Sequence, residues 1–284
     1  MNENTIYCGD NLKVTGPWPD NCVDLVFCSP PYEDARTYGM DFKLKGQDWV
    51  DWAVPRFIEC VRVCKGLVCW VAEGKTRKFR WSATPALLIA DLHRLGISLR
   101  KPPAYQRVGI PGSGGPDWLR NDYEFIICAS KGKLPWSDNT ACGHPPKWKP
   151  GGDMSNRLKN GQRANVYSRN RTRTGSREKR GYFLPKISNP GNVVDCGVVG
   201  GGHMGNKLAH ENEGPFPEKL AEFFIKSFCP PGGIALDPFS GSGTTAAVAE
   251  ALGRKWIAID IRQSQCDLTK KRLEQLAGQM GLFK

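Results

Sequence analysis

Residues 234–245 read Ile-Ala-Leu-Asp-Pro-Phe-Ser-Gly-Ser-Gly-Thr-Thr, and this stretch decides the fold. The apolar run at its start predicts a buried strand, and residues 244–252 predict a helix. Gly241 and Gly243 permit a tight turn between the two and a close approach of the backbone to a ligand. A second apolar run, residues 256–261, predicts the next strand. This order of strand, glycine loop, helix and strand indicates an α/β fold with a ligand at the helix N-terminus.

We call residues 237–245 the cofactor loop. The residues around this loop limit the classes of ligand that it can bind. Asp260 stands at the tip of the following strand, where an acid binds ribose hydroxyls in doubly wound folds; capping of the next helix is the alternative. The loop also fits the fingerprint Gly-x-Gly-x-x-Ala, but too few residues follow it for the second half of a dinucleotide fold. No Gly-x-x-x-x-Gly-Lys-Ser/Thr occurs, which excludes a P-loop. S-adenosylmethionine is therefore the expected cofactor.

A second loop, Ser29-Pro30-Pro31-Tyr32, follows the apolar run 22–28, and we call it the catalytic loop. Ligands of α/β proteins bind at the carboxyl ends of strands, so this loop is expected beside the cofactor loop. The two prolines fix φ and restrict the residue before them, which holds the Ser29 hydroxyl and the carbonyls in a set geometry. These acceptors can receive both hydrogens of an exocyclic amine, and Tyr32 can stack on a base taken out of a helix. Methyl transfer to such an amine needs positioning and exclusion of water, and no metal is expected.

The rest of the pattern alternates between strands and helices. We expect strands at residues 5–8, 22–28, 66–72, 123–129, 234–236 and 256–261, and helices at 47–63, 85–95, 244–252 and 264–277. Both ends of the chain are therefore predicted to belong to one sheet.

Taken together, these residues resemble the amino-methyltransferases that modify DNA at cytosine N4 or adenine N6, in the permuted arrangement called the β class. That class carries its catalytic loop first, its target-recognition region in the middle and its cofactor loop last, as this sequence does. The resemblance implies an α/β, Rossmann-like class I methyltransferase fold: a mostly parallel seven-stranded sheet between helices, with an antiparallel edge pair and an inserted target-recognition region. We expect the catalytic domain at residues 1–130 and 205–284 and the recognition region at 131–204.

The resemblance extends to two further segments. Gly9-Asp10-Asn11 matches the family's acid-bearing segment near the adenine of the cofactor, and residues 216–220 match the segment that opens the helix before the cofactor loop. A turn-forming role for Asp10 and a solvent-exposed position for Lys219 are the alternatives. The implied catalytic residues are Ser29, Pro30, Pro31 and Tyr32. The implied cofactor-binding residues are Asp10, Phe216, Lys219, Asp237, Phe239, Ser240, Gly241, Gly243, Thr244 and Asp260.

The middle of the chain is strongly basic. Residues 147–180 hold eleven basic residues against two acidic ones, a surplus of +9 in a chain whose net charge is +12. One interpretation is a solvated, disordered linker, and the other is a DNA clamp whose cations neutralise phosphates. The expected DNA-binding residues are Lys147, Lys149, Arg157, Arg163, Arg169, Arg171, Arg173 and Arg177.

Composition supports a polyanionic partner inside the cell. The chain has 40 Lys and Arg against 28 Asp and Glu, and its eleven cysteines form no disulfide framework, which favours reduced thiols. Cys60, Cys64 and Cys69 are interpreted as core residues, since a zinc site would lack a fourth ligand. No signal peptide or membrane span is recognisable, so we expect a cytoplasmic protein of bacterial or phage origin without a membrane partner. A second copy of the chain, as a homodimer, and a cognate restriction endonuclease are further possible partners.

The expected activity is methylation of the N4 amine of cytosine in double-stranded DNA, by base flipping and direct displacement. In the family, a Ser at the first position of the catalytic loop accompanies cytosine N4 chemistry and an Asp accompanies adenine N6, so adenine N6 is the alternative. An RNA or protein methyltransferase and a noncatalytic DNA-binding protein with a Rossmann-like core are further alternatives. Cytosine C5 methylation is not expected, because it needs a thiolate nucleophile and the sequence lacks the Pro-Cys pair that the family of C5 enzymes uses.

Overall fold

The computed structural model describes residues 1–34, 42–107, 117–146, 155–157, 163–165, 185–196, 208, 211 and 214–281. Contacts divide the chain into two compact units. The first, which we call the core unit, comprises Met1–Ala141 and Gly191–Lys284, and the second, the insert unit, comprises Cys142–Pro190. None of the described helices is long and apolar enough to cross a membrane.

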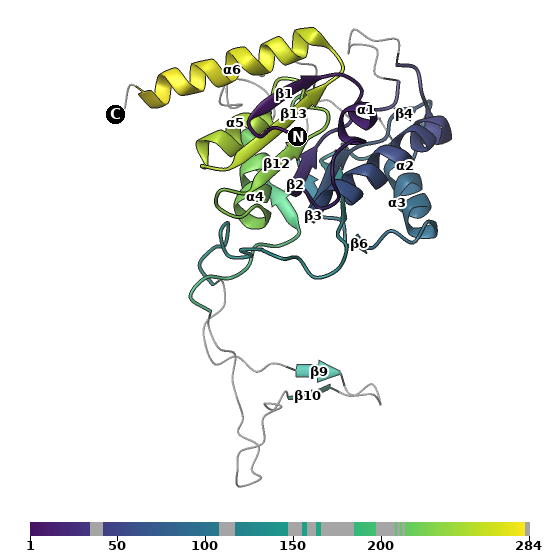
Figure 1. Cartoon of the computed structure of the whole chain (residues 1–284). Helices are drawn as coiled ribbons and strands as arrows, with labels where there is room; N and C mark the ends of the chain where they lie inside the picture. Colours follow the sequence, from purple (N-terminus) through teal and green to yellow (C-terminus); the bar gives the residue numbers. More distant parts are fainter. Residues whose placement is uncertain are drawn as a thin grey trace. The chain divides into compact units, whose positions relative to one another are not determined.

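Among the described residues, a nine-stranded sheet forms the centre of the core unit (Figure 1). Its strands lie in the order β1-β13-β12-β2-β3-β8-β7-β11, and β6 pairs with β8 beside this path. The strands are β1 (Thr5–Cys8), β2 (Val23–Cys28), β3 (Cys64–Ala72), β6 (Leu99–Arg100), β7 (Ala104–Gln106), β8 (Tyr123–Ala129), β11 (Val193–Asp195), β12 (Ile234–Asp237) and β13 (Lys255–Asp260). A separate two-stranded hairpin, β4 (Thr76–Arg77) and β5 (Arg80–Trp81), follows β3.

The sheet is mostly parallel, as the sequence predicts. Every described pairing except those of β8 is parallel, and β8 runs antiparallel to β3, β6 and β7. The predicted count of seven strands was wrong, because β6 and β7 pair with opposite ends of β8 and β11 adds a position beyond β7. The predicted antiparallel edge pair was also wrong in detail, since the reversed strand lies inside the sheet.

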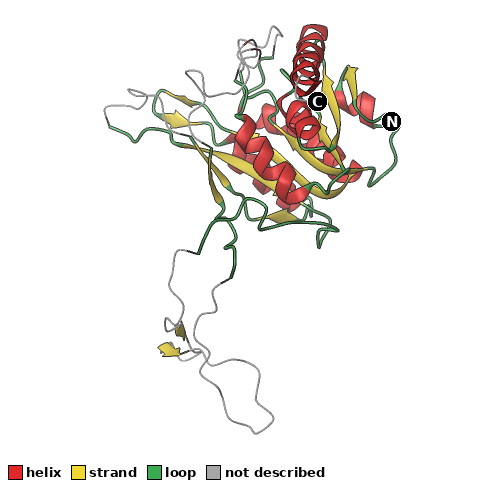
Figure 2. Cartoon of the chain, turned by 90° about the vertical axis from the view of Figure 1, so that its left-hand side faces the viewer, coloured by secondary structure: helices red, strands yellow, loops and turns green. Residues whose placement is uncertain are grey.

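Helices cover both faces of this sheet (Figures 1 and 2). Helices α2 (Gly46–Val63) and α3 (Thr84–Arg94) pack on one face, where Trp49, Phe57 and Leu88 are buried against alternate residues of β2 and β3. Helices α4 (Glu218–Phe228) and α5 (Thr244–Ala251) pack on the other, where Phe224 stacks on Phe27. The short α1 (Asn11–Thr15) contacts α2, and α6 (Gln263–Gly281) contacts α5 and β1. Burial on both faces explains why the strand sequences are continuously apolar.

The insert unit contains an antiparallel pair, β9 (Ser155–Arg157) and β10 (Arg163–Asn165). A bridge between His144 and Ser188 joins its two ends. The stretch 131–204, which the sequence assigns to a recognition region, is not coextensive with this unit, because β11 pairs with β7 in the core sheet. Its role in target recognition stays a prediction.

Candidate active site

The cofactor loop begins where β12 ends. Asp237 is fully buried, and its carboxylate accepts a hydrogen bond from the amide of Phe239 (3.0 Å). Burial raises the pKa of Asp237 to about 7. Gly241 and Gly243 both have positive φ, 50° and 73°, so the two glycines make the turn that ends at the N-terminus of α5. Gly243 is the N-cap residue of that helix.

Asp260, the last residue of β13, contacts this loop directly. One carboxylate oxygen accepts a hydrogen bond from the amide of Gly241 (3.0 Å), and the other accepts one from the amide of Arg262 (2.9 Å). Each oxygen has a second lone pair, so the carboxylate can still accept bonds from ligand hydroxyls. Asp260 therefore shapes the loop and also lines its ligand side.

The catalytic and cofactor loops leave neighbouring strands. β2 and β12 are parallel and adjacent, with Leu25 opposite Ala235. The Thr245 hydroxyl, at the start of α5, donates to the carbonyl of Phe27 (3.2 Å), two residues before Ser29. Parallel strands end at the same edge of a sheet, so the two loops meet there although more than 200 residues separate them.

A cavity of about 210 Å³ lies at this meeting point. The described residues that line it include Asp10, Ser29, Pro31, Phe216, Phe239, Ser240, Gly241, Thr244 and Asp260, all of them predicted site residues. The cavity thus brings together side chains from both ends of the chain. Pro30, Tyr32, Lys219, Asp237 and Gly243 are not among these lining residues, and Lys219 is exposed on the first turn of α4.

Ser240 has a feature that points to a ligand. Its side chain is 6% exposed, lines the cavity and has a hydroxyl that bonds no other group in the described part of the chain. An unpartnered buried hydroxyl costs free energy unless a bound molecule supplies the missing hydrogen bond.

The catalytic loop is held from two sides. The Ser29 hydroxyl donates to the carbonyl of Val71 on β3 (3.2 Å), which leaves the lone pairs of the hydroxyl oxygen free to accept. The indole of Trp49, buried on α2, donates to the carbonyl of Pro31 (2.8 Å). Pro30 is buried. The hydroxyl and the two prolines therefore have one defined arrangement.

Tyr32 contacts an ion pair whose carboxylate is buried. Its hydroxyl donates to one oxygen of Glu124 at the start of β8 (2.7 Å), and Arg107 binds the other oxygen. Glu124 is 7% exposed, so the carboxylate depends on these two partners. The contact fixes the ring of Tyr32 relative to β8, and neither partner was predicted from the sequence.

Asp10 has more than one role. Its carboxylate caps α1 by accepting from the amides of Leu12 (3.1 Å) and Lys13 (3.3 Å), and it pairs with Arg56 (2.8 Å). The Arg56 guanidinium also lies over the ring of Trp52, 4.4 Å from its centroid, as expected for a cation–π contact. The side chain that was predicted to contact a ligand therefore also organises the local backbone.

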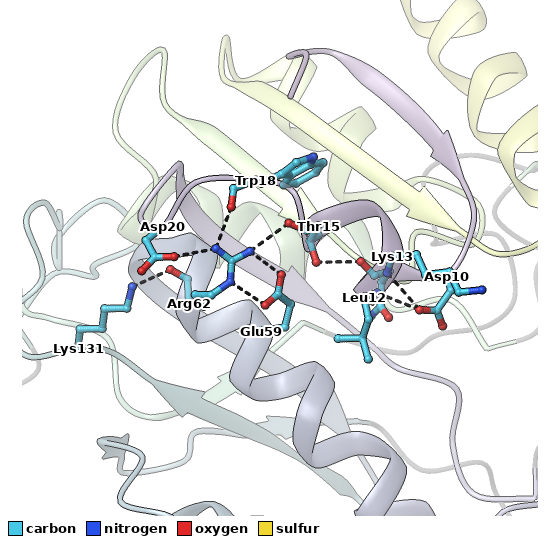
Figure 3. A network of polar contacts seen from close by, with 10 residues as sticks. Asp10, Leu12, Lys13, Thr15, Trp18, Asp20, Glu59, Arg62 and Lys131 are labelled. Atoms are coloured by element: carbon cyan, nitrogen blue, oxygen red, sulfur yellow. Dashed lines mark hydrogen bonds and ion pairs between the residues drawn. The ribbon is translucent and has the colours of Figure 1, made fainter.

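Figure 3 shows how the segment carrying Asp10 is fastened to α2. The guanidinium of Arg62 donates to the carbonyls of Thr15 (3.0 Å) and Trp18 (2.8 Å) and binds both carboxylate oxygens of Glu59. This contact raises the pKa of Arg62 and lowers that of Glu59. Arg62 thus satisfies carbonyls at the end of α1 and fixes this wall of the cavity.

Several lining residues were not predicted as part of the site, among them Trp52 and Arg56. The two tryptophans of α2, Trp49 and Trp52, lie three residues apart on neighbouring turns of the helix. Trp49 is buried in the core and also supports the catalytic loop, whereas Trp52 contacts Phe239 with ring centroids 5.8 Å apart. Spacing alone identifies the helix face but not which of its side chains reaches the cavity.

Of the predicted DNA-binding residues, Arg157 and Arg163 lie within the described residues and are cross-strand partners in β9 and β10. The remaining six lie outside the described residues. These are Lys147, Lys149, Arg169, Arg171, Arg173 and Arg177.

Known proteins resemble this chain along nearly its whole length. The orphan methyltransferase M.BamHII of Bacillus amyloliquefaciens is 29% identical over 263 residues, covering 90% of each chain. The DNA adenine methyltransferase YhdJ of Escherichia coli (strain K12) is 29% identical over 276 residues, covering 95% of this chain and 82% of its own.

Solved structures share the fold. The cytosine-N4-specific PvuII DNA methyltransferase superposes with a TM-score of 0.67 at 19% identity and covers 98% of this chain and 91% of its own. A putative DNA modification methylase of Thermus thermophilus, complexed with S-adenosyl-L-methionine, superposes with a TM-score of 0.59 at 19% identity, covering 96% and 94%. The mixed α/β, Rossmann-like methyltransferase fold predicted from the sequence is confirmed.

The family model described as DNA methylase, N6_N4_Mtase, matches residues 23–271, a range that contains the catalytic loop, the insert unit and the cofactor loop. This chain therefore belongs to the N6 and N4 family of DNA methylases.

Proposed function

We propose that this protein transfers a methyl group from S-adenosylmethionine to the exocyclic N4 amine of cytosine in double-stranded DNA. The observation that carries the proposal is one cavity lined both by Ser29 and Pro31 of the catalytic loop and by Phe239 to Gly241 of the cofactor loop, which follow neighbouring strands. A donor and an acceptor that react directly must share such a site.

The residues around the cavity fit S-adenosylmethionine. Asp260 can accept bonds from ribose hydroxyls, and the Ser240 hydroxyl lacks a partner that a polar ligand would provide. Phe216 and Phe239 offer apolar surface for an adenine ring, and Asp10 and Arg56 supply polar groups beside it. Bound there, the cofactor would supply a sulfonium-activated methyl group. A relative of the same fold was solved with S-adenosyl-L-methionine.

Ser29 is proposed to orient the amine. Its own hydrogen is engaged by the carbonyl of Val71, so its oxygen can serve the amine only as an acceptor, together with the proline carbonyls of the loop, of which that of Pro31 already accepts one bond from Trp49. Two acceptors that take the two hydrogens of a planar amine leave the nitrogen lone pair directed out of the base plane, toward an electrophile. The Tyr32 ring, held by Glu124, is proposed to stack on the flipped base.

Cytosine N4 is favoured by Ser29 at the first position of the loop, and adenine N6 is the alternative. The two similar proteins whose targets are known from their names divide between these bases, since PvuII methyltransferase is cytosine-N4-specific and YhdJ is an adenine methyltransferase. Both amines are planar, so the same acceptors can serve either base.

The experiment is methylation of unmodified plasmid DNA with purified protein and S-adenosylmethionine, followed by mass spectrometry of the nucleosides. N4-methylcytosine is expected, N6-methyladenine would establish the alternative, and no cofactor binding by calorimetry would favour a noncatalytic DNA-binding protein. Ser29→Ala is expected to lower kcat by about 100-fold or more, with little change in cofactor affinity. This is the size of effect seen when an enzyme loses one group for general acid–base catalysis or for electrostatic stabilisation of the transition state. Equal losses in turnover and cofactor affinity would contradict the proposed role of Ser29.

A further inference from the structure

Among the described residues, none of 76–81, which form the β4–β5 hairpin, lines the cofactor cavity or belongs to the buried core. Its strands are two residues long, and the two residues between them, Lys78 and Phe79, form the tip. Phe79 is 84% exposed, and Lys78 and Arg80 are exposed as well. Within the described part of the chain, neither Lys78 nor Arg80 makes a side-chain hydrogen bond or ion pair.

We propose that this hairpin is a second DNA-contacting element, in which Phe79 lies between or against bases beside the target and Lys78 and Arg80 bind phosphates. The proposal rests on the proposed function, since it takes duplex DNA as the substrate. It assigns to the core unit a DNA contact that is separate from the basic residues at 147–180.

Backbone strain at the tip is the first argument. Lys78 and Phe79 have φ of 47° and 62°, so both lie in the left-handed region. A two-residue turn with positive φ at both positions strongly prefers Asn-Gly, because side chains larger than those of Asn and Gly cost roughly 1–2 kcal/mol each in this conformation. Single exposed apolar residues are common on protein surfaces, but a phenylalanine held in a strained turn is not explained by folding.

Attachment to the catalytic loop is the second argument. Glu33, which follows Tyr32, accepts a hydrogen bond from the amide of Lys75 at the base of the hairpin (2.8 Å). The Lys75 ammonium donates to the carbonyl of Asp34 (2.6 Å), and Arg77 pairs with the Asp34 carboxylate. The hairpin is therefore fixed to the residues directly after the catalytic loop.

The second strand of the hairpin is fixed to the same edge of the sheet. The indole of Trp81 donates to Glu73 at the end of β3 (3.0 Å) and stacks on Phe125, with ring centroids 6.0 Å apart and planes at 20°. Phe125 follows Glu124, the residue that holds Tyr32. These contacts place the hairpin at the carboxyl edge of β3, beside the position expected for the target base.

Charge selects duplex DNA as the occupant. Residues 75–81 contain four cations and no acid; Asp34 neutralises part of that charge, while Lys78 and Arg80 remain available. Proteins that distort DNA often insert an apolar side chain at a base step and anchor it with flanking cations on phosphates. A flipped base leaves a gap in the stack that an aromatic ring can fill.

The test replaces the tip by the sequence that the turn prefers, Lys78→Asn with Phe79→Gly. Because this pair relieves the strain, the variant should melt at a temperature equal to or above that of the unaltered protein, while kcat/KM on duplex plasmid DNA falls about tenfold or more and cofactor affinity is unchanged. A fall in melting temperature with unchanged kcat/KM would overturn the proposal. Leu95→Ala, at another exposed apolar residue, is the matched control and should change neither the melting temperature nor kcat/KM.

A second variant tests the phosphate contacts. Lys78→Ala with Arg80→Ala should lower the slope of log binding constant against log salt concentration by about 1.8 for a fluorescent duplex, since each phosphate contact contributes about 0.9. An unchanged slope would overturn the assignment of these two cations. If the unaltered protein neither binds nor methylates duplex DNA, both this proposal and the proposed function fail. If the unaltered protein methylates duplex DNA and both variants do so equally well, only the proposal about the hairpin fails.

Discussion

The close packing of the cofactor loop depends on one residue, Gly243. A Cβ atom at this position would lie 2.5 Å from Cγ2 of Thr269 on α6, and the φ of 73° is unfavourable for any side chain. Thr269 also donates from its hydroxyl to the carbonyl of Gly241 (2.9 Å). The loop and α6 are therefore in contact at a distance that only glycine allows.

Gly243→Ala is expected to lower the free energy of unfolding by about 2–4 kcal/mol, from backbone strain and overpacking together, and to weaken cofactor binding. Gly253→Ala is the matched control, because Gly253 has φ of 65° but no atom within 4 Å of the added Cβ. That control should lose about 1–2 kcal/mol, the strain alone. Urea unfolding and calorimetry with S-adenosylmethionine measure both quantities, and equal losses in the two variants would contradict the packing argument.

At the scale of elements, α6 supports the cofactor loop from behind. Arg272 is 1% exposed, and its guanidinium donates to the hydroxyl of Thr244 (2.9 Å), the carbonyl of Ser242 (3.2 Å) and the carboxylate of Glu218 on α4 (2.5 Å). Burial lowers the pKa of Arg272, and Glu218 opposes this shift. One side chain thus joins α6, α4 and the start of α5.

Arg272→Met is expected to lower the free energy of unfolding by about 2–3 kcal/mol and to weaken cofactor binding about tenfold, because the loop loses its support and Glu218 loses its partner. Lys271→Met, at the exposed neighbouring position, should leave both quantities unchanged. Thermal unfolding and calorimetry provide the two measurements. Destabilisation without any change in cofactor affinity would show that Arg272 stabilises the fold but does not support the loop.

The longer elements could be predicted from the sequence, and the shorter ones could not. The limits of β1 and β8 match the predicted strands residue for residue, because turn-forming residues bound both runs. The strands β4 to β7 and β11 have two or three residues, too few to show a period of two. The burial of Arg272 was equally hidden, since an arginine on a polar helix is normally exposed.

The whole molecule joins its two halves at the centre of the sheet, where β2 pairs with β12. The meeting of the catalytic and cofactor loops could be predicted because both follow buried strands of an α/β pattern. The order of the strands could not be derived from the residues and came from a family resemblance. The contacts of Glu124, Trp49 and Arg62 with the site depend on that order, so these contacts could be identified only from the structure.

Replacing residues 147–180 by a short Gly-Ser linker is expected to reduce affinity for duplex DNA by about 100-fold or more at low salt, because most of the net positive charge is removed. Cofactor affinity and melting temperature should stay close to those of the full chain, because this segment lies in the insert unit and the cavity lies in the core unit. Fluorescence anisotropy with a labelled duplex measures the first and calorimetry the second. A shortened protein that binds the duplex normally would refute the DNA clamp.

The pairing of β1 with β13 has a consequence for synthesis on the ribosome. β1 pairs only with β13 among the described strands, and β13 is translated some 250 residues later. A nascent chain therefore carries an unpaired β1 and an open edge on β2 until almost all of it has emerged. We expect chaperones to engage these edges, and methylation competence to arise abruptly, near the end of translation.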